Sequence, residues 1–304
     1  MPELPEVEIT ARRLDAALRG ARIESALAPG INALKTFDPP LSALADSEIA
    51  GVGRRGKHLV VEVRTASGVG AGGKSDAGPA SRARAAGDEL ALLIHLMSAG
   101  RLQLFDKHAG PRDRTSRVLL RIADGRELRL REFGSKQAAW AKLLPAMELA
   151  QDESLAKLGP EAWPDPPELG ELLAASRPLH TVLRDQHVIA GIGRSWVDEI
   201  LWQAQLSPYK RGGDLQDDEP QRLRAAIIAV LGGAIDHYEN EVTLPIPDKL
   251  PMPLQVHRHE DQPCPRCQTT LRAVHFEDYV IAYCPTCQTE GRVLKDRRLS
   301  RLLK

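Results

Sequence analysis

The sequence predicts an α+β protein of several domains, in which an N-terminal helix and a β-sandwich are followed by a helical domain and a small cysteine-bound module. Three observations support this fold class. Apolar residues recur at helical spacing near the N-terminus, short strand-like runs follow, and all four cysteines stand in two close pairs near the C-terminus. The predicted domain boundaries are 1–134, 135–250 and 251–304.

The first predicted element is a helix. Val7, Ala11, Leu14 and Leu18 recur at a spacing that places them on one helical face. The segment starts with MPELPEVE, whose proline at position 5 suits a first turn, and the glycine at position 20 can end the helix.

From about Ile23 to Phe133 the pattern changes to short apolar runs with turn signals, which predicts a β-sandwich or barrel. The clearest runs are His58–Val63, Leu90–Leu96, Arg117–Ile122 and Glu127–Leu130. Asp124-Gly125 predicts a hairpin turn before the last of them. The insert from Ala66 to Gly87 is rich in Gly, Ala and Ser, and we expect a flexible loop without chemistry there.

After Gly134 the pattern predicts helices. A proline-rich stretch from Pro160 to Pro167 interrupts them, and helical periodicity returns in Trp196–Leu206 and Gln221–Tyr238. A second proline-rich stretch, 245–253, leads into the cysteine module.

Charge is balanced over the 304 residues, with 41 basic and 41 acidic side chains. Two stretches are locally basic, Pro111–Arg131 and the tail Gly291–Lys304, as phosphate binding requires, although solvated faces would give the same pattern. No apolar run reaches transmembrane length, and the N-terminus has no apolar signal segment. We therefore expect a soluble, cytoplasmic protein with no membrane partner.

The cysteines form the pairs Cys264-Pro-Arg-Cys267 and Cys284-Pro-Thr-Cys287, separated by sixteen residues that resemble a hairpin. Four thiolates at this spacing predict one structural zinc ion in a closed tetrahedral site. Because four cysteines saturate zinc, we expect His257 and His259 at the surface instead of at the metal.

The N-terminus carries the predicted chemistry. Removal of Met1 before the small Pro2 would expose a secondary amine with a pKa of about 7.7–8.0, low enough for a useful neutral fraction. Such an amine can attack C1′ of a nucleotide and displace its base. The resulting iminium ion acidifies C2′ and allows one or two eliminations that break the strand. Glu3 could shuttle protons during these steps. Glu6 is a second candidate, and its alternative role is to favour a helix N-terminus.

These residues carry a resemblance to a known family. The N-terminal MPELPEVE resembles the hallmark of the formamidopyrimidine-DNA glycosylase / endonuclease VIII family. Further segments resemble that family in order along the chain, and they are Arg54–Leu59, Leu155–Glu161, Asp185–Leu201 and the two cysteine pairs.

The resemblance implies a β-sandwich, a helix–two-turn–helix domain and a zinc finger, with damaged double-stranded DNA as partner and the damaged nucleotide flipped out of the stack. It implies a monomeric base-excision repair enzyme, a bifunctional DNA glycosylase and abasic-site lyase. By matching positions, Pro2 is the nucleophile, Glu3 the acid and base, and Lys57 a phosphate-binding lysine.

The chain also departs from the family. The glycine-rich turn is Gly191-Ile-Gly193-Arg194, where an arginine replaces the asparagine that contacts a phosphate. The backbone of this turn and Arg194 could still bind phosphate, whereas a purely structural helix start is the alternative. The tip arginine expected before the third cysteine is Tyr279, and we expect Arg292, Lys295, Arg297 and Arg298 of the tail to supply phosphate contacts unless the tail is disordered.

Two DNA-contacting segments are altered as well. The wedge methionine of the family aligns with Ser98, and Met97 is one residue away. On a strand this shift would place Met97 on the opposite face, unless a bulge re-aims it so that Met97 acts as the DNA-binding wedge. The family's RRFG loop, whose arginine and phenylalanine enter the duplex, is Arg131-Glu-Phe133-Gly here. The resemblance therefore implies DNA contacts of Arg131 and Phe133, whereas Glu132 stands where an arginine is expected to read the opposite base. An acid there would repel phosphate or accept a hydrogen bond from a cytosine amino group.

Two other classes of function compete with the enzyme. A damage-binding protein of the same fold is favoured by the altered wedge and finger, but it has no need of an N-terminal secondary amine. A zinc-ribbon transcription factor would explain the cysteine module alone. Pro2 and Glu3 therefore favour the enzyme.

Overall fold

The computed structural model describes residues 2–65, 89–110, 113–133, 136–173, 176–276 and 279–295. The insert Ala66–Gly87 and the tail residues Arg297 and Arg298 lie outside these residues. The chain divides into two compact units. The first contains Met1–Pro2, Val7–Ala156 and Val242–Leu250, and the second contains Glu3–Glu6, Lys157–Glu241 and Pro251–Lys304.

Two four-stranded antiparallel sheets form the first unit, as far as the described residues show. One has the order β1-β6-β7-β5, with strands Ile23–Leu27, Ser116–Ile122, Glu127–Glu132 and Gly100–Phe105. The other has the order β2-β3-β4-β8, with strands Glu48–Arg55, His58–Arg64, Glu89–His95 and Trp140–Pro145. The predicted strands are confirmed, and Gly125, with φ of +94°, forms the turn between β6 and β7.

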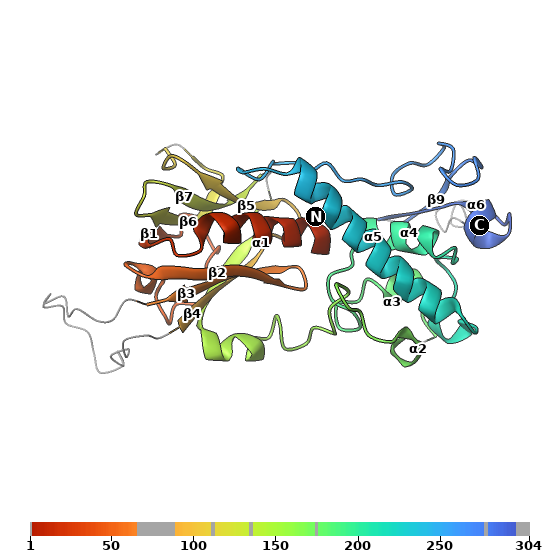
Figure 1. Ribbon diagram of the computed structural model, residues 1–304, viewed down its shortest axis with the longest axis horizontal. Coiled ribbons are helices and arrows are strands. Elements are labelled where there is room, and N and C mark those ends of the chain that lie inside the picture. The colour runs from red at the N-terminus through yellow and green to blue at the C-terminus, as the bar shows by residue number, and fades with distance from the viewer. Residues whose placement is uncertain are drawn as a thin grey trace, which may run out of the picture. The chain divides into compact units, whose positions relative to one another are not determined.

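Helix α1 (Leu4–Leu18) lies between the strands of the two sheets (Figure 1). Its predicted apolar face is confirmed, because Val7, Ala11, Leu14 and Leu18 are buried in one core with side chains of both sheets. Two short 3₁₀ helices, η1 (Leu41–Leu44) and η2 (Ala146–Gln151), complete the unit.

The helical pattern predicted directly after Gly134 is wrong, because Trp140–Pro145 is strand β8. Ile94 of β4 pairs with Ala141 of β8, so that β8 is an edge strand of the second sheet. The segment Trp140–Pro145 is too short for local periodicity to distinguish a strand from a helix, and pairing with β4 decides its conformation.

The second unit is helical at its centre. Its helices are α2 (Leu169–Leu172), α3 (Leu179–Val182), α4 (Arg194–Gln203) and α5 (Glu219–Glu241), with the 3₁₀ helix η3 (Gly212–Asp214). Helices α4 and α5 pack against each other, as Figure 1 shows, and they match the two long helical patterns of the sequence.

The cysteine module consists of the predicted hairpin, β9 (Arg272–His275) and β10 (Val280–Tyr283), followed by helix α6 (Pro285–Thr289). Two adjacent carboxylates of α4 anchor it. Glu199 accepts hydrogen bonds from the backbone N–H groups of residues 255–257, and Asp198 accepts one from Ala282 N–H. His257 also contacts Asp198 through Nδ1 at 2.7 Å and is buried, so the expectation that it lies at the surface is wrong.

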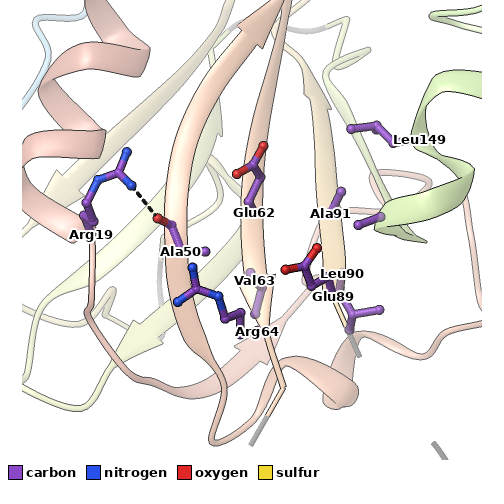
Figure 2. Close-up of a pocket in the computed structure, with 10 residues that line it drawn as sticks. Arg19, Ala50, Glu62, Val63, Arg64, Glu89, Leu90, Ala91 and Leu149 are labelled. Atoms are coloured by element: carbon purple, nitrogen blue, oxygen red, sulfur yellow. Dashed lines mark hydrogen bonds between the residues drawn. The ribbon is translucent and has the colours of Figure 1, made fainter. Parts of the chain in front are cut away.

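A pocket of about 260 Å³ lies on β2, β3 and β4 of the first unit (Figure 2). Arg19 donates to the Ala50 carbonyl at its edge, and the carboxylates of Glu62 and Glu89 face the same space. Its lining, within the described residues, includes none of the predicted site residues. In the described part of the chain, no helix is both long enough and apolar enough to cross a membrane.

Candidate active site and nucleic-acid interface

Glu3 is the best-defined of the predicted catalytic residues. Its side chain is buried, and Oε1 accepts the Ser195 N–H at 2.9 Å, while Oε2 lies 3.4 Å from the Trp196 nitrogen. These are N–H groups of the first turn of α4, which have no partner within their own helix. The carboxylate of Glu3 therefore occupies the positive end of α4, directly after the half-buried Pro2 in the chain.

Both glycines of the turn before α4 lie so close to other side chains that a Cβ at either position would clash. A Cβ on Gly193 would lie 2.2 Å from Cδ of Glu3, and one on Gly191 would lie 2.4 Å from a methyl carbon of Leu4. Gly191 also has a left-handed φ of +108°. The turn thus packs against the start of α1, which supports a structural role for both glycines. Contacts of these glycines with DNA stay a prediction.

Glu6 is buried among hydrogen-bond donors. Its Oε1 accepts the Tyr238 hydroxyl at 2.7 Å and the Trp196 indole N–H at 3.1 Å, and its Oε2 accepts the Glu3 backbone N–H at 2.8 Å. The last bond is half of a capping box at the start of α1, so a role at the helix N-terminus is confirmed. Burial and, second, the negative charge of Glu3 raise the pKa of Glu6 to about 7.

Lys57 lies in the turn between β2 and β3 and is only 8% exposed. An ion pair joins this hairpin to α1, because Nε of Arg54 lies 2.8 Å from a carboxylate oxygen of Glu8. Arg54 also donates to the Gly56 carbonyl in the same turn. The lysine predicted to bind phosphate is thus on a braced turn, and its role stays a prediction.

Beside this turn, His95 at the end of β4 is neutral. Burial, and then the positive charges of His58 and Lys57, lower the pKa of His95 to about 3. Its Nδ1 accepts the Met97 N–H at 3.0 Å. Met97, Ser98 and Ala99 form a turn, and Met97 has a φ of +49°. The expectation that Met97 and Ser98 point to opposite faces of a strand is therefore wrong, because neither residue is in a strand. Met97 is half-buried and Ser98 is exposed.

The segment predicted to enter DNA lies at the end of β7. Arg131 donates to Thr115 and to Gln103, both at 3.0 Å, and its guanidinium lies 4.7 Å from the ring centre of Phe133. Glu132 is buried, accepts the Ala139 N–H at 2.9 Å and lies 3.6 Å from Nε of Arg117. The expectation that Glu132 meets a phosphate or a base is therefore wrong, because its carboxylate points into the protein.

The basic stretch around these strands is largely neutralised by internal carboxylates. Glu127 is fully buried and pairs with Arg129 at 2.7 Å and with Arg121 at 3.4 Å. Arg126 pairs with Asp124 at 2.7 Å. The count of arginines alone therefore overstates the positive charge that this stretch offers to a nucleic acid.

The four cysteines of the module come together. Their sulfur atoms all lie within 4.8 Å of one another, with Sγ of Cys267 and Cys284 3.4 Å apart and Sγ of Cys264 and Cys287 3.9 Å apart. Tetrahedral coordination at about 2.3 Å would separate sulfurs by about 3.8 Å, so the arrangement is compatible with a structural metal site. The Trp202 indole N–H points at Sγ of Cys264 from 3.3 Å and would orient that ligand.

Several residues that shape the site have no recognisable motif in the sequence. Trp196 and Tyr238, which hold Glu6, were expected only as part of helical patterns, and the anchors Asp198 and Glu199 were not singled out. The sequence does carry one signal for the anchors, because the adjacent acids Asp198 and Glu199 interrupt an apolar helical segment, WVDEIL, whose residues are all buried. Buried charges need partners, and here the partners are backbone N–H groups far along the chain.

Comparison with known proteins agrees with this architecture. Residues 1–135 match the model of the formamidopyrimidine-DNA glycosylase N-terminal domain, and residues 161–245 match that of the formamidopyrimidine-DNA glycosylase H2TH domain. A formamidopyrimidine-DNA glycosylase of Moorella thermoacetica is 33% identical over 289 residues, covering 90% of this chain and 94% of that protein. One of Roseiflexus sp. is 30% identical over 303 residues, covering 95% and 100%.

Solved structures show the same fold. The Lactococcus lactis Fpg in complex with an abasic site containing DNA superposes with a TM-score of 0.74 at 24% identity, covering 94% of this chain and 99% of that one. MutM in complex with carbocyclic 8-oxo-G containing DNA also has a TM-score of 0.74, covering 95% and 100%. With both domain models and full-length relatives in agreement, the chain belongs to the formamidopyrimidine-DNA glycosylase family.

Proposed function

We propose that this protein is a DNA glycosylase and abasic-site lyase that removes damaged, oxidised bases from double-stranded DNA. The observation that carries this proposal is the fixed geometry directly after Pro2. Glu3 is buried and bonded to the first N–H groups of α4, and Glu6 accepts the N–H of the Pro2–Glu3 peptide. These contacts fix the backbone and the carboxylate of the residue that follows Pro2, which favours pre-organisation of the N-terminus for reaction.

The reaction begins with the neutral secondary amine of Pro2, after loss of Met1. The nitrogen lone pair attacks C1′ of the flipped nucleotide, and the bond from C1′ to the base breaks, with the electron pair and a proton going to the base. The nitrogen then loses its proton, its lone pair forms the C=N bond of an iminium ion, and the bond from C1′ to the ring oxygen breaks. Glu3 takes up the proton that the nitrogen loses and passes it to this oxygen.

Strand cleavage follows from the iminium ion. A C2′ proton is removed, the electrons form a double bond to C3′, and the 3′ phosphate leaves with its bonding pair. Repetition at C4′ and C5′ would release the 5′ phosphate as well. Lys57 on its braced turn, and Arg194 at the start of α4, are the side chains that we assign to backbone phosphates.

Zinc is the metal that fits the four-cysteine cluster, because the sulfur spacing matches tetrahedral coordination and four thiolates close the site. When bound, it supplies folding free energy to the module and takes no part in the reaction. The domain boundaries 134/135 and 250/251 belong to the same proposal.

The experiment is borohydride trapping on a duplex that contains one abasic site. Protein with Met1 removed, as verified by mass spectrometry, is expected to form a covalent adduct at Pro2. The matched control carries one additional residue before Pro2, which converts its amine into an amide and should abolish the adduct without disturbing the fold. Tight DNA binding without any adduct from the processed protein would refute the lyase and favour a damage-binding protein.

A further inference from the structure

Four side chains of β5, β7 and the residue after β7 form a ladder in which guanidinium groups alternate with aromatic rings. The guanidinium carbon of Arg129 lies 4.2 Å from the ring centre of Phe105, and that of Arg131 lies 5.4 Å from the same ring. The guanidinium carbon of Arg131 also lies 4.7 Å from the ring centre of Phe133. Because an aromatic face attracts a guanidinium group, the ladder links Phe133 to the body of the sheet.

The inner end of this ladder is fixed by a buried ion pair. Nε of Arg129 lies 2.7 Å from the carboxylate of Glu127, which is fully buried, and the guanidinium of Arg129 also donates to the Lys107 carbonyl. Breaking a buried ion pair is strongly destabilising, so Arg129 stays in place. Phe105 therefore packs against a cation that cannot move away, and it offers its ring to Arg131 in a fixed position.

Gln103 of β5 holds Arg131 through its side-chain amide. Oε1 of Gln103 accepts a hydrogen bond from Nη1 of Arg131 at 3.0 Å. Nε2 of Gln103 donates to the Ile246 carbonyl and, at 3.0 Å, to the carboxylate of Asp248. Gln103 is only 3% exposed, so turning its amide would break hydrogen bonds in a buried place. Nε of Arg131 donates in addition to Thr115, and the guanidinium is thus held from two sides.

The next residue of β7 is anchored on the opposite face of the strand. Alternate residues of a strand point to opposite faces, and Glu132 is buried where Arg131 is not. The carboxylate of Glu132 accepts the Ala139 N–H and lies 3.6 Å from Nε of Arg117. The backbone that leads to Phe133 is therefore held on both faces of β7, by Arg131 on one and by Glu132 on the other.

We propose that Phe105 and Gln103 are positioning residues that hold Arg131 and Phe133 as one preformed pair, and that they thereby set the preference of the protein for a damaged position over intact duplex. The inference rests on the proposed function for its partner, damaged duplex DNA, and on the family resemblance for the entry of the Arg131–Phe133 pair into it. Entering a base stack costs least where a base is missing. Because the pair is ordered before binding, it loses little conformational entropy when it enters, and this gain is confined to the damaged site.

The test is a preference ratio, the Kd for intact duplex divided by the Kd for the same duplex with one tetrahydrofuran abasic analogue, which cannot react with Pro2. It is measured on the full-length zinc-loaded protein. Phe133→Ala removes the entering ring and should lower the ratio about 5-fold or more. Phe105→Leu should lower it by about 2- to 5-fold, and Gln103→Met by a similar factor. Phe105→Tyr keeps a ring beside Arg131 and should retain the wild-type ratio.

A double variant and a packing control separate positioning from a general loss of stability. If Phe105 acts through the Arg131–Phe133 pair, Phe105→Leu should lower the preference ratio less in a Phe133→Ala background than in the wild type. Val118→Ala is the packing control, because Val118 is buried in the core on the other face of the same sheet. It should lower the Tm and leave the preference ratio unchanged.

Unchanged preference ratios in Phe105→Leu and Gln103→Met would overturn the proposal, and so would an unchanged ratio in Phe133→Ala. An effect of Phe105→Leu that is equal with and without Phe133 would also overturn it, because Phe105 would then only support the fold. Borohydride trapping on a reactive abasic duplex judges the lyase separately. An adduct at Pro2 with unchanged ratios would refute the positioning alone, and lowered ratios without a wild-type adduct would refute the lyase alone.

Discussion

Gly193 faces the carboxylate of Glu3 so closely that a single added methyl group would lie 2.2 Å from Cδ of Glu3. The two residues are far apart in sequence, and their contact brings the start of α4 to the residue that follows Pro2. Three constraints meet at this point, namely the absence of a Cβ at Gly193, the hydrogen bond from Ser195 N–H, and the capping contact of Glu6.

We predict that Gly193→Ala displaces Glu3 and reduces base excision by at least about 100-fold, the usual effect of removing a positioned acid or base. The control is Gly233→Ala in α5, where a Cβ meets nothing within 4 Å. That change should stabilise the protein by about 0.5–1 kcal/mol. Single-turnover excision and denaturant unfolding measure the two effects; equal excision rates in both variants would contradict the role of Gly193.

A second prediction concerns pH and Glu6. Its pKa is raised from 4.5 in the unfolded chain to about 7 in the fold, so the folded state binds more protons between these values. The contribution of Glu6 to stability is therefore complete below about pH 4.5 and is lost as pH rises to about 7, by an amount of about 3 kcal/mol.

Glu6→Gln should remove this part of the pH dependence. Denaturant unfolding at several pH values gives the free energy of unfolding for both proteins, and the difference between them should change steadily from about pH 4.5 to about pH 7. The exposed Glu24→Gln variant is the control. A constant difference across that range would show that Glu6 has an ordinary pKa.

A third prediction concerns the metal. The protein should contain one zinc ion per chain, and its removal by a chelator should unfold the cysteine module. Trp202 reports on this change, because its indole N–H contacts Sγ of Cys264 and the guanidinium of Arg266 lies 4.4 Å from its ring. Chelation should shift the tryptophan fluorescence of the wild type, and it should shift that of Trp202→Phe much less. The Cys264→Ser variant should bind less than one equivalent of zinc.

A fourth prediction concerns the brace between α1 and the turn of Lys57. Arg54 is 6% exposed at its side chain, and Arg54→Met would remove this partner of Glu8 while the exposed pair of Glu8 with Arg12 stays. We expect a loss of stability of about 1–3 kcal/mol and weaker binding to abasic DNA as the turn of Lys57 loosens. Arg12→Met is the matched control, since Arg12 also pairs with Glu8 but is exposed. Equal DNA affinity in the two variants would contradict a bracing role.

Sequence alone determined the elements whose signals are local. The periodic face of α1, the hairpin turn at Gly125 and the spacing of the cysteine pairs each depend on residues within a few positions of one another. The same holds for the N-terminal motif that carries the family resemblance, because it is contiguous. Such patterns survive in the fold because local geometry and burial act in the same direction.

Tertiary structure decided what depends on partners distant in sequence. Trp140–Pro145 became a strand because β4 offers an edge to pair with. Glu132 and His257 became internal because Arg117 and Asp198 meet them there, and Met97 left the strand because β4 ends in a turn. A buried charge is tolerated only beside a complementary group, and no local pattern reveals which distant residue will supply it.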